Sequence, residues 1–275
     1  MISEDRQKIL NKIAEYEKNQ WWDKDVEDDP ETIVLMPDKV DYLYEKPFAK
    51  MWNRIANKKA VKFFDNTLKK GEWILKEVRG IENFIAVKGG AIITCNHFNA
   101  FDNYAIYKAI KDHLRKGQNL YKVIREGNYT NFKGIFGFFF RHCNTLPLSS
   151  NFETMKKFYS AISTLLYRGE KILIYPEQGM WWNYRKPRPM KNGAFRFAVT
   201  NNVPIIPAFI TLEDTENLDN NGYPVQAYTV HFLPAIYPKE NTSVKENSEY
   251  LMKTNYDVWK EVYEEFYKIP LKYGE

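Results

Sequence analysis

The fold is decided by residues 92–103, which read Ile92-Ile93-Thr94-Cys95-Asn96-His97-Phe98-Asn99-Ala100-Phe101-Asp102-Asn103. The apolar, β-branched run at the start predicts a buried strand, and the polar residues after it predict a turn. A helical pattern begins at Asp102. The stretch therefore places one histidine and one carboxylate at the C-terminal edge of a strand, where ligands bind in open α/β sheets.

His97 and Asp102 suggest acid–base chemistry. An imidazole that is held by a carboxylate is a common device for taking a proton from a hydroxyl near neutral pH. We interpret His97 as a general base and Asp102 as the residue that orients it. A single histidine in a turn is more often a surface residue or a hydrogen-bonded core residue, so this pair alone is a weak signal.

The chain around this stretch alternates strands and helices, which predicts an α/β fold with a mixed, largely parallel central sheet covered by helices. We assign residues 81–275 to this domain. A capping box that begins at Ser150 opens one of the helices. The predicted strands are 84–87, 91–94, 171–175, 204–211 and 225–233, and the predicted helices are 102–114, 150–169 and 249–268.

Residues 1–80 predict a helical N-terminal segment. A short helix is expected over residues 2–16, followed by an acidic break over 23–30. Residues 1–45 carry 6 Lys/Arg against 13 Asp/Glu, whereas residues 46–80 carry 10 against 3. This reversal of charge suggests that the second part faces something anionic. Membrane phospholipid fits better than nucleic acid, because the basic part is also amphipathic.

The amphipathic helix from residue 48 combines aromatic residues with lysines, as in helices that lie among lipid headgroups. The alternative is a helix that packs on the catalytic domain and exposes a solvated basic face. The residues expected to meet the membrane are Trp52, Lys58, Lys59, Lys62, Phe63 and Phe64.

Composition indicates where in the cell the protein is expected. Apolar residues make up 44% of the chain, enough for a sizeable core, yet no uninterrupted apolar run is long enough to span a bilayer. The N-terminus has no apolar export signal. Cys95 and Cys143 are expected to be free thiols. We therefore expect a cytoplasmic protein that binds the inner face of the cell membrane peripherally.

Three blocks, in order, resemble motifs of the glycerophospholipid acyltransferase family, the lysophosphatidate acyltransferases and their relatives. Residues 92–103 resemble its Asn-His-x4-Asp block. The second block resembles its Phe-Pro-Glu-Gly block and reads Lys171-Ile172-Leu173-Ile174-Tyr175-Pro176-Glu177-Gln178-Gly179. The third resembles its Lys-x-Gly and Val-Pro-Ile-x-Pro blocks and reads Lys191-Asn192-Gly193-Ala194 and Val203-Pro204-Ile205-Ile206-Pro207.

The resemblance implies transfer of a fatty acyl group from acyl-CoA or acyl carrier protein to a hydroxyl of a lipid acceptor, such as 1-acyl-glycerol-3-phosphate. No metal or cofactor is implied. Asn96 and Glu177 would bind substrate, although Glu177 could instead shape its turn or pair with a basic residue. The backbone amides of the turn that carries Glu177, Gln178 and Gly179 are candidate donors to an oxyanion. Cys95 is a weaker rival as a covalent nucleophile.

The chain departs from the family at its phosphate-binding arginines. Met180 follows the Glu177 turn where an arginine is common, and Ser149 and Ser150 stand where the other arginine is expected. Either a basic cluster supplies a phosphate clamp from an altered loop, or the acceptor is a glycolipid or an amine-bearing lipid. The basic cluster consists of Arg185, Lys186 and Arg188.

Aromatic residues leave further alternatives open. Trp181 and Trp182 could form a surface for a sugar, an acyl chain or the membrane, or a buried core pair. An aromatic run could line the acyl chain or belong to the core, and it comprises Phe136, Phe138, Phe139 and Phe140. Rival functions are transfer to an amine, thioester hydrolysis, and lipid binding without catalysis.

Overall fold

The structure is a computed structural model, and it describes residues 3–27 and 32–274. Part of the expected acidic break at 23–30 and Ile2 of the expected first helix lie outside these residues. Among the described residues, seven strands form one sheet with the order β1-β7-β6-β2-β5-β3-β4. The strands are β1 (Ile74–Arg79), β2 (Ala91–Thr94), β3 (Leu120–Ile124), β4 (Thr145–Pro147), β5 (Lys171–Ile174), β6 (Ile205–Leu218) and β7 (Pro224–Phe232).

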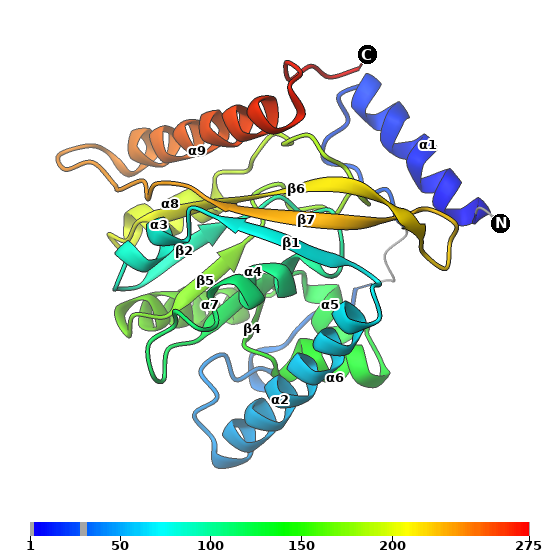
Figure 1. Ribbon diagram of the computed structural model, residues 1–275. Coiled ribbons are helices and arrows are strands. Elements are labelled where there is room, and N and C mark those ends of the chain that lie inside the picture. Colours follow the sequence, from blue (N-terminus) through cyan, green and yellow to red (C-terminus); the bar gives the residue numbers. More distant parts are fainter. Residues whose placement is uncertain (1–2, 28–31, 275) are drawn as a thin grey trace.

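Neighbouring strands run parallel except β6 and β7, which are antiparallel. The prediction of a mixed, largely parallel sheet covered by helices is therefore confirmed (Figure 1). The helices are α1 (Glu4–Lys18), α2 (Pro47–Lys69), α3 (Ile81–Ala86), α4 (Asp102–Ile110), α5 (Glu126–Thr130), α6 (Gly134–His142), α7 (Phe152–Tyr167), α8 (Gly193–Thr200) and α9 (Val244–Tyr267).

The sheet is covered on both faces, which explains why its central strands β2 and β5 are buried at every position and mostly apolar. Ile93 packs in one core cluster, with side chains of α3 and α4. Its neighbour Ile92 packs in the opposite cluster, with side chains of α7 and α8. Successive strand residues point to opposite faces, so the apolar residues of β2 pack in the cores on both sides of the sheet.

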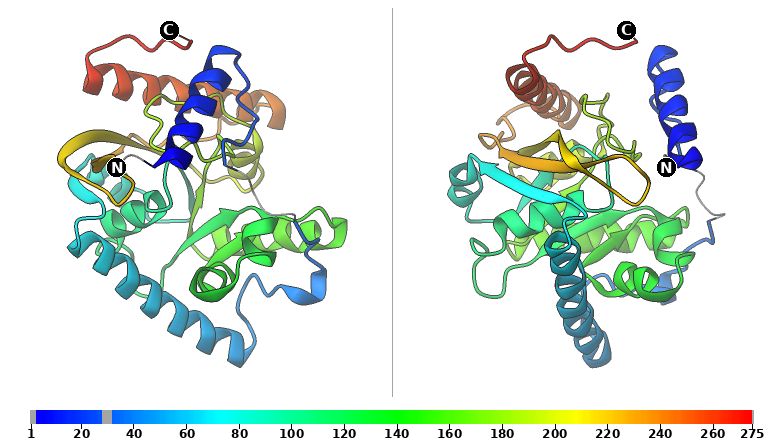
Figure 2. Two further views of the ribbon diagram at one scale, coloured as in Figure 1. Left: turned by 90° about the vertical axis from the view of Figure 1, so that its right-hand side faces the viewer. Right: turned by 45° about the vertical axis from the view of Figure 1, so that its right-hand side comes forward.

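The N-terminal helices lie at two different sides of the sheet domain. Figure 2 shows α1 near the C-terminal tail and α2 extending from the side on which α5 and α6 lie. α2 packs on the domain through Ala56 and Phe64. The sheet begins at β1, before residue 81, while the division of the chain at residue 80 stays a prediction.

Several predicted elements are wrong. Residues 84–86 form the second half of α3 and Val87 caps it, so 84–87 is not a strand, because Ile81, Phe84 and Ile85 are spaced to place one helical face on the core. A short apolar run does not distinguish the two structures by itself. Asn151, not Ser150, caps α7 by accepting a hydrogen bond from the Thr154 amide. α4 ends at Ile110, short of residue 114.

Strands β1, β3 and β4 and helices α5, α6 and α8 were not predicted. β4 has only three residues, and α6 (GIFGFFFRH) has three of its phenylalanines in one consecutive run. Neither segment shows a clear period of two or 3.6. Their structure depends on pairing with β3 and packing against α2.

The start of β2 lies close to α7, so alanine substitutions at two adjacent glycines should differ sharply in their effect on the free energy of unfolding. A Cβ at Gly90 would lie 2.1 Å from the main-chain oxygen of Leu166, whereas a Cβ at Gly89 would meet nothing within 4 Å. Gly90→Ala should lower the free energy of unfolding by about 2 kcal/mol or more, as measured by urea denaturation. Gly89→Ala is the matched control and should change it by less than about 0.5 kcal/mol. Equal effects of the two substitutions would contradict this packing.

Candidate active site

The turn after β2 brings the Asp102 carboxylate into contact with the imidazole of His97. Nδ1 of His97 lies 2.7 Å from Oδ2 of Asp102. The Asp102 side chain is fully buried, whereas the His97 side chain is 24% exposed. The histidine therefore has one nitrogen on a buried carboxylate and an edge that solvent reaches, as a general base requires.

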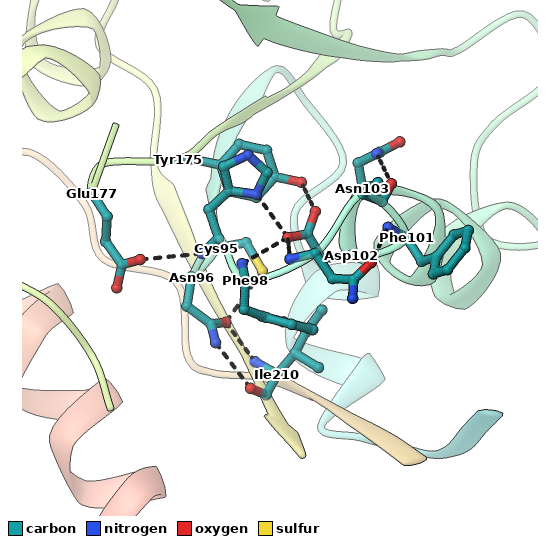
Figure 3. A network of polar contacts seen from close by, with 12 residues as sticks. Cys95, Asn96, Phe98, Phe101, Asp102, Asn103, Tyr175, Glu177 and Ile210 are labelled. Carbon is teal, nitrogen blue, oxygen red and sulfur yellow. Dashed lines mark hydrogen bonds and ion pairs between the residues drawn. The ribbon is translucent and has the colours of Figure 1, made fainter. Parts of the chain in front are cut away.

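Asp102 accepts hydrogen bonds from three further groups (Figure 3). The backbone amides of Phe98 and Asn99 each lie 3.1 Å from Oδ2. The hydroxyl of Tyr175 donates to Oδ1 over 2.6 Å. A buried carboxylate is costly unless hydrogen bonds compensate it, and these donors supply that compensation and fix the position of the Asp102 side chain.

Tyr175 was missed as a site residue. It follows β5 directly, and β5 pairs with β2 so that Ile174 lies opposite Thr94. Its ring stacks on the imidazole of His97 with centroids 4.0 Å apart. Burial, reinforced by the nearby Asp102, raises the pKa of the Tyr175 hydroxyl well above its usual value, so it stays a donor. Its position at the end of a strand was the one signal available in the sequence.

Glu177 connects the turn after β5 to the turn after β2. Its Oε2 accepts the His97 backbone amide at 3.2 Å, and its Oε1 accepts the Arg188 amide at 2.8 Å. The guanidinium of Arg188 is also 3.1 Å from Oε2, and both side chains are almost completely buried. The structure thus gives Glu177 the alternative role, shaping its turn in a buried ion pair. Binding of acceptor hydroxyls by Glu177 stays a prediction.

Two of the amides expected to stabilise an oxyanion are engaged within the turn. Gln178 N–H donates to the Tyr175 carbonyl, and Gly179 N–H donates to the Glu177 carbonyl. Gln178 adopts a left-handed backbone with φ of 64°. The expectation that these two N–H groups are available is therefore corrected. Together with Glu177 they line a cavity of about 310 Å³.

The side chain of Asn96 points to the neighbouring strand β6 rather than to solvent. Its amide donates to the Ile210 carbonyl and accepts the Ile210 amide, at 3.0 and 2.8 Å. The side chain is 2% exposed. It extends the β2–β6 pairing past the end of β2, so the structure gives it a role in supporting the turn instead of contacting substrate.

The three members of the basic cluster point to three different acidic partners. Arg185 pairs with Asp214 at 2.7 Å. Lys186 pairs with Glu17 of α1 at 2.5 Å. Arg188 pairs with Glu177. The expected joint clamp of Arg185, Lys186 and Arg188 is not formed, because tertiary contacts separate side chains that are neighbours in sequence.

The aromatic alternatives are resolved in part. Trp181 is fully buried and Trp182 nearly so, which makes them a core pair. Trp181 stacks on Trp22 from the N-terminal segment, with centroids 5.6 Å apart. On α6, Phe139 is buried and Phe136 is 43% exposed. An acyl-chain role for Phe136, Phe138, Phe139 and Phe140 stays a prediction.

Cys95 does not suit covalent catalysis. Its side chain is fully buried on the core face of the sheet. Burial raises the pKa of its thiol well above the usual value, and the charges of Asp102 and Glu177 add to this effect. Cys95 and Cys143 are both free, as expected.

The fold and the site together define an α/β protein with a histidine–carboxylate pair at the C-terminal edge of a largely parallel sheet. Residues 76–211 match the Acyltransferase family model, and the chain belongs to the acyltransferase family. It is therefore an enzyme of the acyl-transferring class. A comparison with curated proteins found no match.

Several solved structures have a similar fold, among them the 1-acyl-sn-glycerophosphate (LPA) acyltransferase PlsC from Thermotoga maritima. The TM-score is 0.53 at 17% sequence identity, and the match covers 83% of this chain and 87% of that one. At this identity the likeness concerns the fold.

The contacts of Tyr175 predict separable effects on stability and turnover. Tyr175→Phe removes one hydrogen bond to a buried charge, which should cost about 2 kcal/mol of unfolding free energy. It keeps the ring on His97, so kcat should fall less than tenfold and KM should not change, because the hydroxyl lies on Asp102. Denaturation and steady-state kinetics check this, with Tyr159→Phe as an exposed control. A large rise in KM would contradict the assigned position.

Proposed function

We propose that the protein transfers a fatty acyl group from acyl-CoA or acyl carrier protein to a hydroxyl of a lipid acceptor, with 1-acyl-glycerol-3-phosphate as the leading candidate. The 2.7 Å contact between His97 and Asp102 carries the proposal. An ionised Asp102 that accepts from Nδ1–H leaves Nε2 of the neutral imidazole free to accept a proton.

The proposed reaction needs no covalent enzyme intermediate. Nε2 of His97 takes the proton of the acceptor hydroxyl while the oxygen of that hydroxyl attacks the thioester carbonyl carbon. Asp102 stabilises the imidazolium that forms. When the tetrahedral intermediate collapses, the C–S bond breaks, the imidazolium returns the proton to the thiolate, and the new ester leaves. Water or an amine in place of the hydroxyl would give thioester hydrolysis or N-acylation.

His97→Ala should lower acyl transfer by at least about a thousandfold, because removal of a catalytic-triad member costs this much or more. The assay follows labelled acyl groups from acyl-CoA and, separately, from acyl carrier protein to a panel of acceptors. His113→Ala is the matched control, since His113 is exposed and far from this turn in sequence. Full activity of His97→Ala with an intact fold would end the proposal.

Asp102→Asn should lower kcat by about 10³ to 10⁴, because an amide in place of the carboxylate favours the wrong imidazole tautomer. Asp112→Asn makes the same change at an exposed site and should leave kcat unaltered. The comparison uses steady-state kinetics at one pH. A kcat within tenfold of the parent would remove Asp102 from the mechanism.

We also propose that α2 and α6 bind the membrane surface. No helix of the described chain is both long and apolar enough to cross a bilayer. Lys58, Lys59 and Lys62 are exposed on α2. Phe63 and Phe64 pack on α6 and α4 and are partly buried, and their expected contact with lipid stays a prediction. The exposed apolar side chains of the two helices are Phe48, Met51, Trp52, Ile135 and Phe136.

Replacing Lys58, Lys59 and Lys62 by glutamate should weaken binding to anionic vesicles at least tenfold, since each lysine near such a surface contributes about 1 kcal/mol. Cosedimentation with phosphatidylglycerol vesicles measures this, and neutral phosphatidylcholine vesicles should show little difference. The control changes three exposed lysines of α9, Lys245, Lys253 and Lys260. Equal losses in the two variants would mean that net charge, not this face, governs binding.

A further inference from the structure

The cavity beside the catalytic turn has an unusual second wall. Glu177–Gly179 form one side. The other side comes from residues 22–25 of the N-terminal segment, which joins α1 to the rest of the chain. Arg125, directly after β3, and Lys191, ahead of α8, complete it. Segments far apart in the sequence thus meet at one opening beside the His97 turn.

Two of the cationic residues that line this cavity, Arg125 and Lys191, are held by carboxylates of the N-terminal segment. The Arg125 guanidinium makes a two-point contact with Asp25, at 2.6 and 2.8 Å. Lys191 lies 2.5 Å from Asp23. The carboxylates are partly exposed, at 74% for Asp23 and 41% for Asp25. Planar two-point binding of a carboxylate by arginine is the same geometry by which arginine binds phosphate.

A third cation nearby has unused donors. Arg188 is 1% exposed, and its Nε and Nη1 have no hydrogen-bond partner. Buried donors without a partner are rare in folded proteins. A Cβ at Gly179 would lie 3.3 Å from Oδ1 of Asp25, and 3.6 Å from both Nη2 of Arg125 and Nη1 of Arg188. The two arginines and the aspartate therefore gather around the glycine that lines the cavity.

We propose that this cavity is the phosphate subsite of the acyl acceptor, formed by Arg125 and Lys191 with Arg188 behind them, and that Asp23 and Asp25 are built-in competing anions. The proposal rests on the function proposed above. A phosphate carries up to two charges and more acceptor oxygens than a carboxylate, so it can displace the two aspartates. A volume of about 310 Å³ is at the lower end for small-molecule sites, which suits a phosphate headgroup.

The exchange requires only side chains to move. Trp22 anchors the segment between Trp181 and Tyr273, with ring centroids 5.6 and 4.8 Å away. Asp23 and Asp25 follow it and face solvent in part, so they can rotate outward while the backbone stays in place. The proposal also explains how a phosphate could be bound although Arg185 and Lys186 point elsewhere.

The first test measures equilibrium binding of inorganic phosphate and of glycerol 3-phosphate by titration calorimetry. The double variant Asp23→Asn/Asp25→Asn should bind them about fivefold more tightly, because two competing ion pairs are removed. Arg125→Gln and Lys191→Gln should each bind about tenfold more weakly. Asp5→Asn, which removes an exposed charge of α1 paired with Lys8, should match the parent. Misfolding cannot produce the gain expected of the double variant.

Unchanged or weaker phosphate binding by the aspartate double variant would overturn the proposal, as would unchanged binding by Arg125→Gln. The second test measures KM for acceptor and for donor, since acyl-CoA also carries phosphates. A lower acceptor KM in the double variant, with the donor KM constant, supports an acceptor subsite. A shift of the donor KM alone overturns it. Phosphate binding as expected without any acyl transfer would refute the proposed function and leave the subsite standing.

Discussion

The buried carboxylate of Asp102 is the constraint on which the site depends. A fully buried charge is tolerated only when donors surround it, and here the imidazole, two backbone amides and the Tyr175 hydroxyl do so. These donors come from the turn after β2 and from the end of β5. Satisfying one charge therefore fixes the conformation of the turn, the start of α4 and the position of the histidine.

A second buried charge supports the first from the neighbouring turn. Glu177 holds the His97 backbone and Arg188 at once, so the two turns at the sheet edge form one polar network. Its members are linked through parallel pairing of β2 with β5 and of β2 with β6. Such a network holds the imidazole rigid, which favours catalysis by position and electrostatics, while the exposed edge of the histidine stays open to substrate.

The N-terminal segment is part of the site rather than only an appendage. Trp22 packs on Trp181, Lys186 pairs with Glu17 of α1, and Asp23 and Asp25 cover the cations of the cavity. The acidic residues Asp23 and Asp25 of this segment thus form ion pairs with Lys191 and Arg125. The basic helix α2 lies elsewhere, beside α6. The acidic part of the chain is therefore near the His97 turn, whereas the basic part is on the face proposed to meet lipid.

The sequence by itself determined the pairing of His97 with Asp102, the largely apolar central strands and the mixed, largely parallel sheet, because these features show in residues near one another in the chain. Tertiary structure alone decided the partners of Asn96, Glu177 and Arg188, and it separated Arg185 and Lys186 from Arg188. It also decided β1, β4 and α6, whose patterns are ambiguous until they pair or pack. Side-chain charges find their partners through the fold, over separations that sequence spacing does not encode, so the cavity around Gly179 could be recognised only in three dimensions.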